Sequence, residues 1–392
     1  MARTQEALYR DLDLDVQLDL SWSERDLPQR ERTKHVHGLH PYLGKFVPQL
    51  VEILLARYVR PGGHVLDPFA GSGTTLVQGL ESRFDATGVD VAGFNCLLME
   101  VKTRRYDAFL LERELRAVAD RARSLEASES EPHRRSRYLA TWYAPRAAAE
   151  LLAFRALIGE YVHEDLLRVV LARAARSARR AAHYDLEFPR EPQRGPYWCY
   201  KHRRTCHPVE AASPFLARYA LDTLARLRAF AQVRPQRGEA RVVHADARTI
   251  ELGGPFDAIL TSPPYPGLID YHEQHRYAYE LLGLPQRPEG ELGAPALGRR
   301  RESLAAYADG IVAVLENVLP RLRRTAPVLI VVNDRCELYP EILERAGLRL
   351  EDRLRRHVNR RTGRRGGEFY EDVLVTRAGR ASRVRGTRPQ RR

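Results

Sequence analysis

Short apolar runs alternate with helical patterns near the start of the chain. Apolar side chains recur at helical spacing over residues 47–59, and the Pro/Gly-rich segment 60–63 ends that helix. The run 64–67 predicts a short buried strand, followed by a helix over 74–82 and a second strand over 86–90. This order is a βαβ unit, whose parallel strands are joined by a right-handed crossover.

The strand pattern returns after residue 240. Strands are expected at 241–246, 256–261, 328–332, 348–358 and 369–376, and helices at 271–282 and 304–319. The run 328–332 is entirely apolar, which is typical of a strand buried on both faces of a parallel sheet. The last two strands would flank an Arg-rich turn and close the sheet as an antiparallel pair. The Gly- and Pro-rich segment 285–303 reads as a loop or lid.

These patterns predict the α/β class, with a doubly wound, mostly parallel, Rossmann-like sheet that carries a largely helical insertion. Long Arg/Ala/Leu/Glu segments form the insertion, which interrupts the chain between the second and third strands. The expected organisation is a polar lead-in (1–33), an α/β domain (34–100 and 238–378), the helical insertion (101–237) and a basic, disordered tail (379–392).

Composition favours a polyanionic partner. The net charge is +13, which attracts nucleic acid, although only four of the 64 basic residues are lysine and coding bias is an alternative explanation. Hydrophobic residues make up 44% of the chain, enough for a core, and no apolar run approaches the roughly 20 residues that span a bilayer. With no secretory pattern and four cysteines, we expect a cytoplasmic protein with reduced thiols.

The first strand runs into a glycine-rich turn, Asp67-Pro-Phe-Ala-Gly-Ser-Gly-Thr-Thr75. Glycine lets the backbone approach a ligand and take positive φ, and the first βα turn of a doubly wound sheet is where nucleotide cofactors lie. The turn lacks the Gly-Lys-Ser/Thr ending of a P-loop, which argues against triphosphate binding.

Three acids follow strands. Asp67 could bind a cation such as an ammonium group, Asp90 could accept bonds from ribose hydroxyls, and Asp246 could accept one from an adenine amine. The alternative for each is a helix N-cap or a loop turn.

The strand 256–261 ends on Thr261-Ser262-Pro263-Pro264-Tyr265. Two successive prolines fix φ and remove two N–H donors, which leaves nearby carbonyls free to accept hydrogen bonds. The Ser262 hydroxyl and the Pro263 carbonyl could therefore hold an exocyclic amine, and Tyr265 could stack on its base. Such a pocket requires the base to be flipped out of a duplex. The alternative is a plain turn or polyproline segment.

Both motifs resemble those of S-adenosylmethionine-dependent amino-methyltransferases that act on N4 of cytosine or N6 of adenine in DNA. Ser-Pro-Pro-Tyr is more typical of the N4-cytosine branch, since adenine enzymes more often begin this motif with Asp or Asn. The segment 37–46 resembles the stretch that precedes the cofactor motif and folds over the methionine end. The resemblance covers about residues 34–95 and 241–376, and implies a methyltransferase fold for the α/β domain.

The resemblance implies S-adenosyl-L-methionine as the cofactor. The expected cofactor-binding residues are His40, Tyr42, Lys45, Asp67, Pro68, Phe69, Gly71, Ser72, Gly73, Thr74, Asp90 and Asp246. The expected catalytic residues are Ser262, Pro263, Pro264 and Tyr265. The insertion 101–237 could recognise the target, but its place between the second and third strands is unusual, so no target sequence follows.

Within the insertion, residues 197–207 interleave aromatic and basic side chains, a pattern that suits backbone contact and base stacking. The expected nucleic-acid contacts there are Trp198, Tyr200, Lys201, Arg203 and Arg204. Zinc ligation by Cys199, His202, Cys206 and His207 is one alternative, and core packing is another. Adjacent Cys206 and His207 make poor mutual geometry and the spacing is not that of a zinc finger, so no metal is predicted.

Tyr271 and Arg276 follow the Pro-Pro-Tyr corner and are expected to contact the nucleic acid, the alternative being the start of an exposed helix. The basic tail could contact phosphates, or could simply be solvated.

The predicted reaction is in-line methyl transfer from S-adenosylmethionine to N4 of cytosine in double-stranded DNA. No cysteine lies in a nucleophile loop, which argues against C5-cytosine methylation, because that reaction needs a covalent thiolate adduct. The alternatives are N6-adenine methylation of DNA, methylation of a base amine in tRNA or rRNA, and a non-catalytic nucleic-acid-binding protein on this scaffold.

Overall fold

A seven-stranded sheet forms the centre of the part of the chain that the computed structural model describes. The described residues are 20–42, 44, 46–124, 136–186, 189–267, 270–285, 290–293, 300–358 and 369–379. The strand order is β5-β2-β1-β6-β7-β9-β8. The strands are β1 (His64–Asp67), β2 (Asp85–Asp90), β5 (Ala240–His244), β6 (Ala258–Thr261), β7 (Pro327–Val332), β8 (Leu348–His357) and β9 (Tyr370–Ala378). The first five strands in this order are parallel and β9 pairs antiparallel with both β7 and β8, which confirms the predicted sheet.

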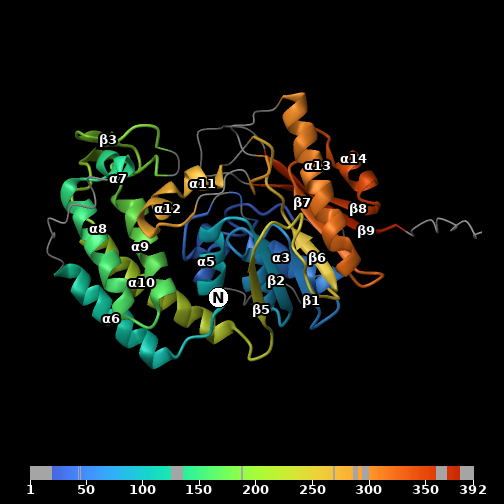
Figure 1. Ribbon diagram of the computed structural model, residues 1–392, viewed down its shortest axis with the longest axis horizontal. Coiled ribbons are helices and arrows are strands. Elements are labelled where there is room, and N and C mark those ends of the chain that lie inside the picture. Colours follow the sequence, from blue (N-terminus) through green and yellow to red (C-terminus); the bar gives the residue numbers. More distant parts are fainter. Residues whose placement is uncertain are drawn as a thin grey trace, which may run out of the picture.

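Helices cover both faces of the sheet (Figure 1). They include α3 (Pro48–Tyr58), α4 (Thr74–Glu81), α5 (Gly93–Thr103), α13 (Arg301–Val318) and α14 (Tyr339–Arg345). Successive strand residues point to opposite faces, so Val65 joins the core under α3 whereas Leu66 joins the core under α13 and α14. The doubly wound arrangement therefore follows from apolar residues at consecutive strand positions.

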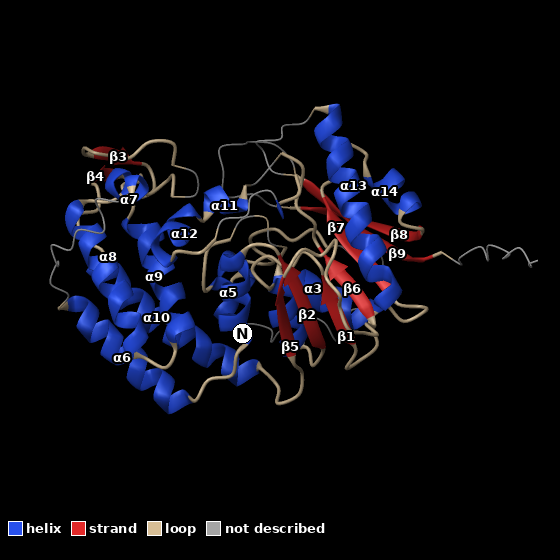
Figure 2. Ribbon diagram, viewed as in Figure 1, coloured by secondary structure: helices blue, strands red, loops and turns tan. Residues whose placement is uncertain are grey.

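A cluster of helices lies beside the sheet, built by the chain between β2 and β5 (Figure 2). Its members are α6 (Ala108–Arg123), α7 (Arg137–Trp142), α8 (Pro145–Leu157), α9 (Glu164–Ala178) and α10 (Ser213–Val233). They share one apolar core with α5. Most of the inserted segment is thus helical, as its composition suggested.

Two local features differ from the sequence-based prediction. The helix expected over 271–282 is divided at His275 into α11 (Tyr271–Gln274) and α12 (Arg276–Leu282). The buried side chains of α12, including Tyr277 and Leu281, join the core of the helical cluster. The helical insertion also contains an unpredicted antiparallel hairpin, β3 (Tyr197–Cys199) and β4 (Arg204–Cys206).

The remaining short elements are α2 (Gln29–Arg32), η1 (His35–Gly38), η3 (Ile158–Glu160) and η6 (Leu319–Arg321). Leu20, in the predicted polar lead-in, is buried in the core under α3. Residues 1–19, the Arg-rich turn 359–367 and the tail 380–392 lie outside the described residues. Among the described helices, none combines the length and apolar character that a membrane span requires.

Candidate active site

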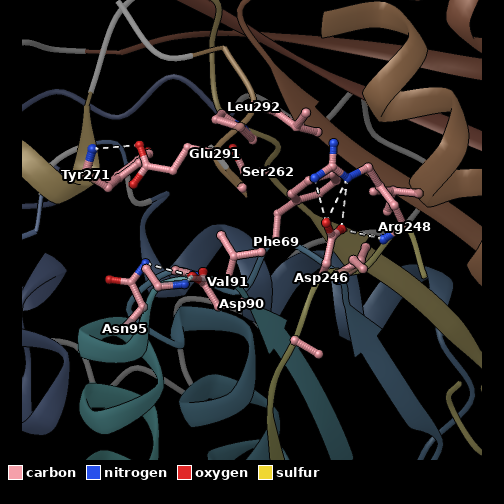
Figure 3. A pocket seen from close by; sticks show the side chains of 18 of the residues that line it. Phe69, Asp90, Val91, Asn95, Asp246, Arg248, Ser262, Tyr271, Glu291 and Leu292 are labelled. Atoms are coloured by element: carbon pink, nitrogen blue, oxygen red, sulfur yellow. Dashed lines mark hydrogen bonds and ion pairs between the residues drawn. The ribbon is translucent and has the colours of Figure 1, made fainter. Parts of the chain in front are cut away.

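The glycine turn and the Pro-Pro-Tyr corner lie at the same edge of the sheet. β1 and β6 are parallel neighbours, so their carboxyl ends meet there. The two motifs line one cavity of about 630 Å³ (Figure 3), Phe69 and Gly71 from the turn and Ser262 and Pro264 from the corner. A cleft outside the carboxyl ends of parallel strands is the usual ligand site of an open α/β sheet.

Asp67 does not line this cavity. Its side chain is buried and accepts hydrogen bonds from the hydroxyls of Thr75 and Thr261, both at 2.6 Å, and from the Phe69 amide at 3.1 Å. Burial raises the pKa of Asp67 to about 6, although these three bonds oppose the rise. The carboxylate therefore joins β1 to α4 and to the end of β6, and the expected contact with a ligand cation is not part of this geometry.

The two glycines of the turn have positive φ. Gly71 has φ of +52°, and a Cβ there would lie 3.0 Å from the Tyr42 hydroxyl. Gly73 has φ of +80°, and a Cβ there would lie 2.7 Å from Cγ of Met99. The turn can pass this close to its neighbours only because both positions lack a side chain.

Asp90, at the end of β2, lines the cavity and fixes the glycine turn. Its carboxylate accepts bonds from the amides of Gly71 and Ala92, both at 2.8 Å, and from Nδ2 of Asn95 at 3.1 Å. Burial raises the pKa of Asp90 to about 7, and the Glu291 carboxylate adds to the rise. The carbonyl oxygen of Asn95 is buried without a hydrogen-bond partner among the described residues, so the cavity wall offers an acceptor.

Stacked aromatic rings form another wall. The rings of Tyr42 and Tyr271 lie 5.3 Å apart and 16° from parallel, and both residues line the cavity. The hydroxyl of Tyr42 accepts a bond from Asn95 at 3.2 Å. Tyr271, expected to contact nucleic acid, thus belongs to the same cavity as the glycine turn.

Asp246 lies at the opposite wall, just beyond β5, and is already paired. The Arg248 guanidinium holds its carboxylate through bonds of 2.6–3.0 Å and lowers the pKa of Asp246 (Figure 3). A ligand amine would share this carboxylate with Arg248.

Glu291 is a cavity residue that the sequence pattern did not reveal. It belongs to the loop 290–293, and its carboxylate accepts bonds from the amides of Tyr271 and His272 and from the His272 ring. Leu292 from the same loop also lines the cavity. The loop lies in a Gly- and Pro-rich segment with no periodic pattern, so the sequence did not indicate that Glu291 lines the cavity. Asn95 is a second cavity residue that was not predicted, although its position five residues after Asp90 could have indicated it.

The Pro-Pro-Tyr corner separates the main cavity from a smaller one of about 380 Å³. Ser262 donates a hydrogen bond from its hydroxyl to the Val331 carbonyl at 3.0 Å, which leaves the lone pairs of Oγ available. Tyr265 and Pro266 line the smaller cavity, not the main one. The Tyr265 hydroxyl donates to Glu371 on β9 at 3.1 Å, and burial raises the pKa of Tyr265 well above its ordinary value.

Several expected site residues lie away from the main cavity. The residues that line the cavity do not include Ser72, Gly73, Thr74 and Pro263. Lys45 lies outside the described residues. His40 is fully buried. Its Nδ1 donates a hydrogen bond to the Pro41 carbonyl, and its Nε2 accepts one from the Tyr277 hydroxyl. Arg276 lies over the Tyr138 ring. The β3–β4 hairpin lies on the helical cluster, beside α7 in Figure 1. It exposes all of the nucleic-acid contacts that were expected there, namely Trp198, Tyr200, Lys201, Arg203 and Arg204.

Comparison with known proteins decides the family. A family model described as DNA methylase (N6_N4_Mtase) matches residues 4–94. The chain is also 34% identical over 453 aligned residues to the type II methyltransferase M.MjaII of Methanocaldococcus jannaschii, covering 94% of this chain and 84% of that protein. The chain belongs to the N6/N4 DNA methylase family. Its methyl donor is S-adenosyl-L-methionine and its substrate is DNA.

Other similarities are weaker. The type II methyltransferase M.MvaI of Kocuria varians is 26% identical over 155 residues, 36% of this methylase and 34% of that protein. TrmN from Thermus thermophilus (14% identity, TM-score 0.34) aligns with 86% of this chain, which spans 50% of that structure. The alignment with the rRNA methyltransferase aviRa from Streptomyces viridochromogenes (14% identity, TM-score 0.32) covers 86% of this chain and 88% of the aviRa chain. At these TM-scores neither structure supports an argument about the methylase.

The main cavity fits S-adenosylmethionine in its chemistry. Phe69, Leu292 and the stacked tyrosines supply apolar and aromatic surface. The carboxylates of Asp90 and Glu291 repel one another, so a ligand with ammonium and sulfonium charges would relieve their repulsion. The unpartnered Asn95 oxygen adds an acceptor for a ligand hydroxyl or amine.

Proposed function

We propose that this methylase modifies N4 of cytosine in double-stranded DNA, as the modification enzyme of a type II restriction–modification system. The Ser262–Tyr265 corner carries the proposal, because it combines the Ser-Pro-Pro-Tyr form with a place on the rim of the cofactor-sized cavity. Two relatives that bear the name of type II methyltransferases support the biological setting.

In this proposal the main cavity holds S-adenosylmethionine. Asp90 accepts bonds from ribose hydroxyls, Asp246 shares its carboxylate with the adenine amine, and Glu291 offers negative charge to the cationic part of the molecule. Asp67 instead fixes the turn and the corner to one another through Thr75 and Thr261. When bound, the cofactor supplies an electrophilic methyl group.

The corner would orient the target amine. The Ser262 hydroxyl already donates to Val331, so toward a ligand it acts as an acceptor, and the Pro263 carbonyl is a second acceptor. Two acceptors that engage the two N–H bonds of an amine direct the nitrogen lone pair away from both. Rate enhancement then comes mainly from positioning and from exclusion of water. The N–C bond would form as the bond between the methyl carbon and sulfur breaks, the sulfonium would leave as a thioether, and the amine would lose its proton to solvent late in the reaction.

A base within a duplex cannot reach this corner, so the target nucleotide would be flipped. The Tyr265 ring, anchored through its hydroxyl to Glu371, offers a rigid surface for stacking beside the smaller cavity. The exposed aromatic and basic side chains of the β3–β4 hairpin would contact the DNA outside the flipped base.

Nucleoside analysis tests the proposal. Genomic DNA and total RNA from cells that express the methylase are digested, and methylated nucleosides are quantified by mass spectrometry. We expect N4-methyldeoxycytidine in DNA, none above background in RNA, and loss of the signal with the Tyr265→Ala variant. N6-methyldeoxyadenosine alone would establish the adenine alternative, and modification confined to RNA would contradict the proposed substrate.

A further inference from the structure

Four potential metal ligands converge at the β3–β4 hairpin, apart from the cofactor cavity. Cys199 lies on β3, Cys206 on β4, His202 in the turn between them, and His183 in the segment after α9. One ligand atom from each of the four lies within 4.8 Å of the corresponding atom of every other. They come from two separate parts of the chain, and the fold brings them together.

The distances in this group agree with tetrahedral zinc coordination. Nδ1 of His202 lies 3.6 Å from Sγ of Cys199 and 3.4 Å from Sγ of Cys206. Zinc–sulfur bonds of about 2.3 Å and zinc–nitrogen bonds of about 2.05 Å at a tetrahedral angle place sulfur and nitrogen about 3.6 Å apart. These two nitrogen–sulfur distances therefore match those of a zinc site, and the other ligand atoms lie within 4.8 Å of one another.

We propose that His183, Cys199, His202 and Cys206 bind a structural Zn²⁺ ion that fastens the β3–β4 hairpin to the helical cluster. Two thiolates and two imidazoles form a standard ligand set for structural zinc, and four protein ligands leave no open position for catalysis.

The individual side chains suit this role. Both cysteines are buried and neither forms a disulfide, so their sulfurs face inward as thiols or thiolates. Nδ1 of His183 is buried without a hydrogen-bond partner among the described residues.

The structure changes the set considered from sequence. His207 is exposed and outside the group, and His183, 16 residues before Cys199 by subtraction, takes the fourth position. The poor geometry of adjacent Cys206 and His207 therefore does not apply. The spacing hid this site because one ligand comes from a different segment.

The hairpin itself gives a reason for a metal. Each strand has three residues, and a two-stranded hairpin of this size is marginal in water without further support. Trp198 is 54% exposed and Tyr200 is 74% exposed, so these two side chains bury little surface. Tyr197 contributes one hydrogen bond, accepted by its hydroxyl from the His183 amide at 3.0 Å. Cross-linking through zinc would hold these side chains in a fixed orientation.

A second group of potential ligands, His35, His37 and Glu81, provides a contrast. There the ammonium of Lys34 lies 2.6 Å from Glu81, so the carboxylate already has a cation. In the described structure, neither a lysine nor an arginine side chain is bonded in this way to the cysteines of the hairpin group.

Metal analysis of the full-length, untagged protein, purified without added metal, tests the proposal. We expect an equimolar amount of zinc by mass spectrometry, lost in the Cys199→Ser/Cys206→Ser double variant. Cys336→Ser and His207→Ala, which alter a cysteine and a histidine outside the group, should keep it. Metal-free wild-type protein, zinc retained by the double variant, or a Cys199–Cys206 disulfide in the wild type would each overturn the proposal.

A second measurement covers the case in which the double variant does not fold. Wild-type protein reconstituted with Co²⁺ should show sulfur-to-cobalt charge-transfer bands and the intense visible bands of tetrahedral cobalt. Their absence would overturn the proposal. Both measurements proceed without a methylation assay, so they remain independent of the proposed function.

Discussion

Asp90 connects the local chemistry of the site to its ligand. Its carboxylate is buried, engaged by three donors and close enough to Glu291 for their charges to interact. Burial and the Glu291 charge disfavour the ionised form in the free protein and outweigh the three donors, which favour it. A cationic or hydroxyl-bearing ligand would also favour the ionised form.

This predicts a pH-dependent affinity for S-adenosylmethionine. Since the pKa of Asp90 is about 7, the carboxyl is mostly neutral at pH 6 and mostly ionised at pH 8. If the ligand requires the ionised form, affinity should be about tenfold lower at pH 6 than at pH 8. Isothermal titration calorimetry across this range measures it. Asp90→Asn should bind weakly with little dependence on pH, and an unchanged slope in that variant would assign the titration to another group.

Tyr265 should separate catalysis from cofactor binding. It borders the smaller cavity and does not line the main one, so Tyr265→Ala should leave the Kd for S-adenosylmethionine within about twofold. Loss of stacking, about 1–3 kcal/mol, should lower turnover on DNA by about 5- to 150-fold. Tyr265→Phe keeps the ring and loses the hydroxyl, which bonds Glu371 and Ser262, so it should retain more activity than the alanine variant. A large loss of cofactor affinity in the alanine variant would contradict the assignment of Tyr265 to the target base and not to the cofactor.

At the scale of single residues, the sequence indicated strand ends better than side-chain directions. Asp67 and Asp90 both end parallel strands, yet one points into the protein and the other lines the cavity. No sequence pattern indicated that Glu291 lines the cavity, because its position depends on a loop that folds back against Tyr271. Direction and loop path are tertiary properties that a local pattern does not contain.

At the scale of elements, apolar runs predicted the sheet accurately. β1 has the predicted bounds, and the edge pair β8 and β9 lies where the pattern placed it. The β3–β4 hairpin was missed because its strands have only three residues each, which is too short for a detectable alternation. The predicted helix 271–282 breaks at His275, where no proline or glycine marks the interruption.

The glycine turn gives a prediction at this scale. Gly73→Ala combines strain at φ of +80° with a clash at 2.7 Å against Met99, so it should destabilise the protein by about 2 kcal/mol or more. Gly62→Ala is the matched control, because it has φ of +69° but no atom within 4 Å of the added Cβ, and strain alone should cost about 1 kcal/mol. Chemical denaturation measures both. Equal losses would show that the close packing of the turn contributes nothing.

At the scale of the whole molecule, a net charge of +13 suits a DNA partner, and the β3–β4 hairpin carries exposed basic side chains. Lys201, Arg203 and Arg204 are all exposed there. Long-range attraction and counterion release would both contribute to affinity.

Replacing these three residues with glutamine should weaken DNA binding and flatten its salt dependence. Each lost phosphate contact should reduce the slope of log K against log salt by about 0.9. Arg345→Gln is the control, since this arginine already pairs with Asp309 and Glu341 and should leave the slope unchanged. Fluorescence anisotropy with a duplex probe at several salt concentrations measures the slopes. A triple variant with the wild-type slope would exclude the hairpin from the DNA interface.

The position of α12 limits how such a protein can be re-engineered. Residues 271–282 follow β6 in the chain, yet Tyr277 and Leu281 are embedded among the inserted helices, while Tyr271 faces the cofactor cavity. A chimera that exchanged only residues 101–237 with a homologue would leave α12 against foreign side chains and disturb a wall of the main cavity. The transplantable unit therefore includes both segments, although more than thirty residues of the sheet domain separate them in sequence.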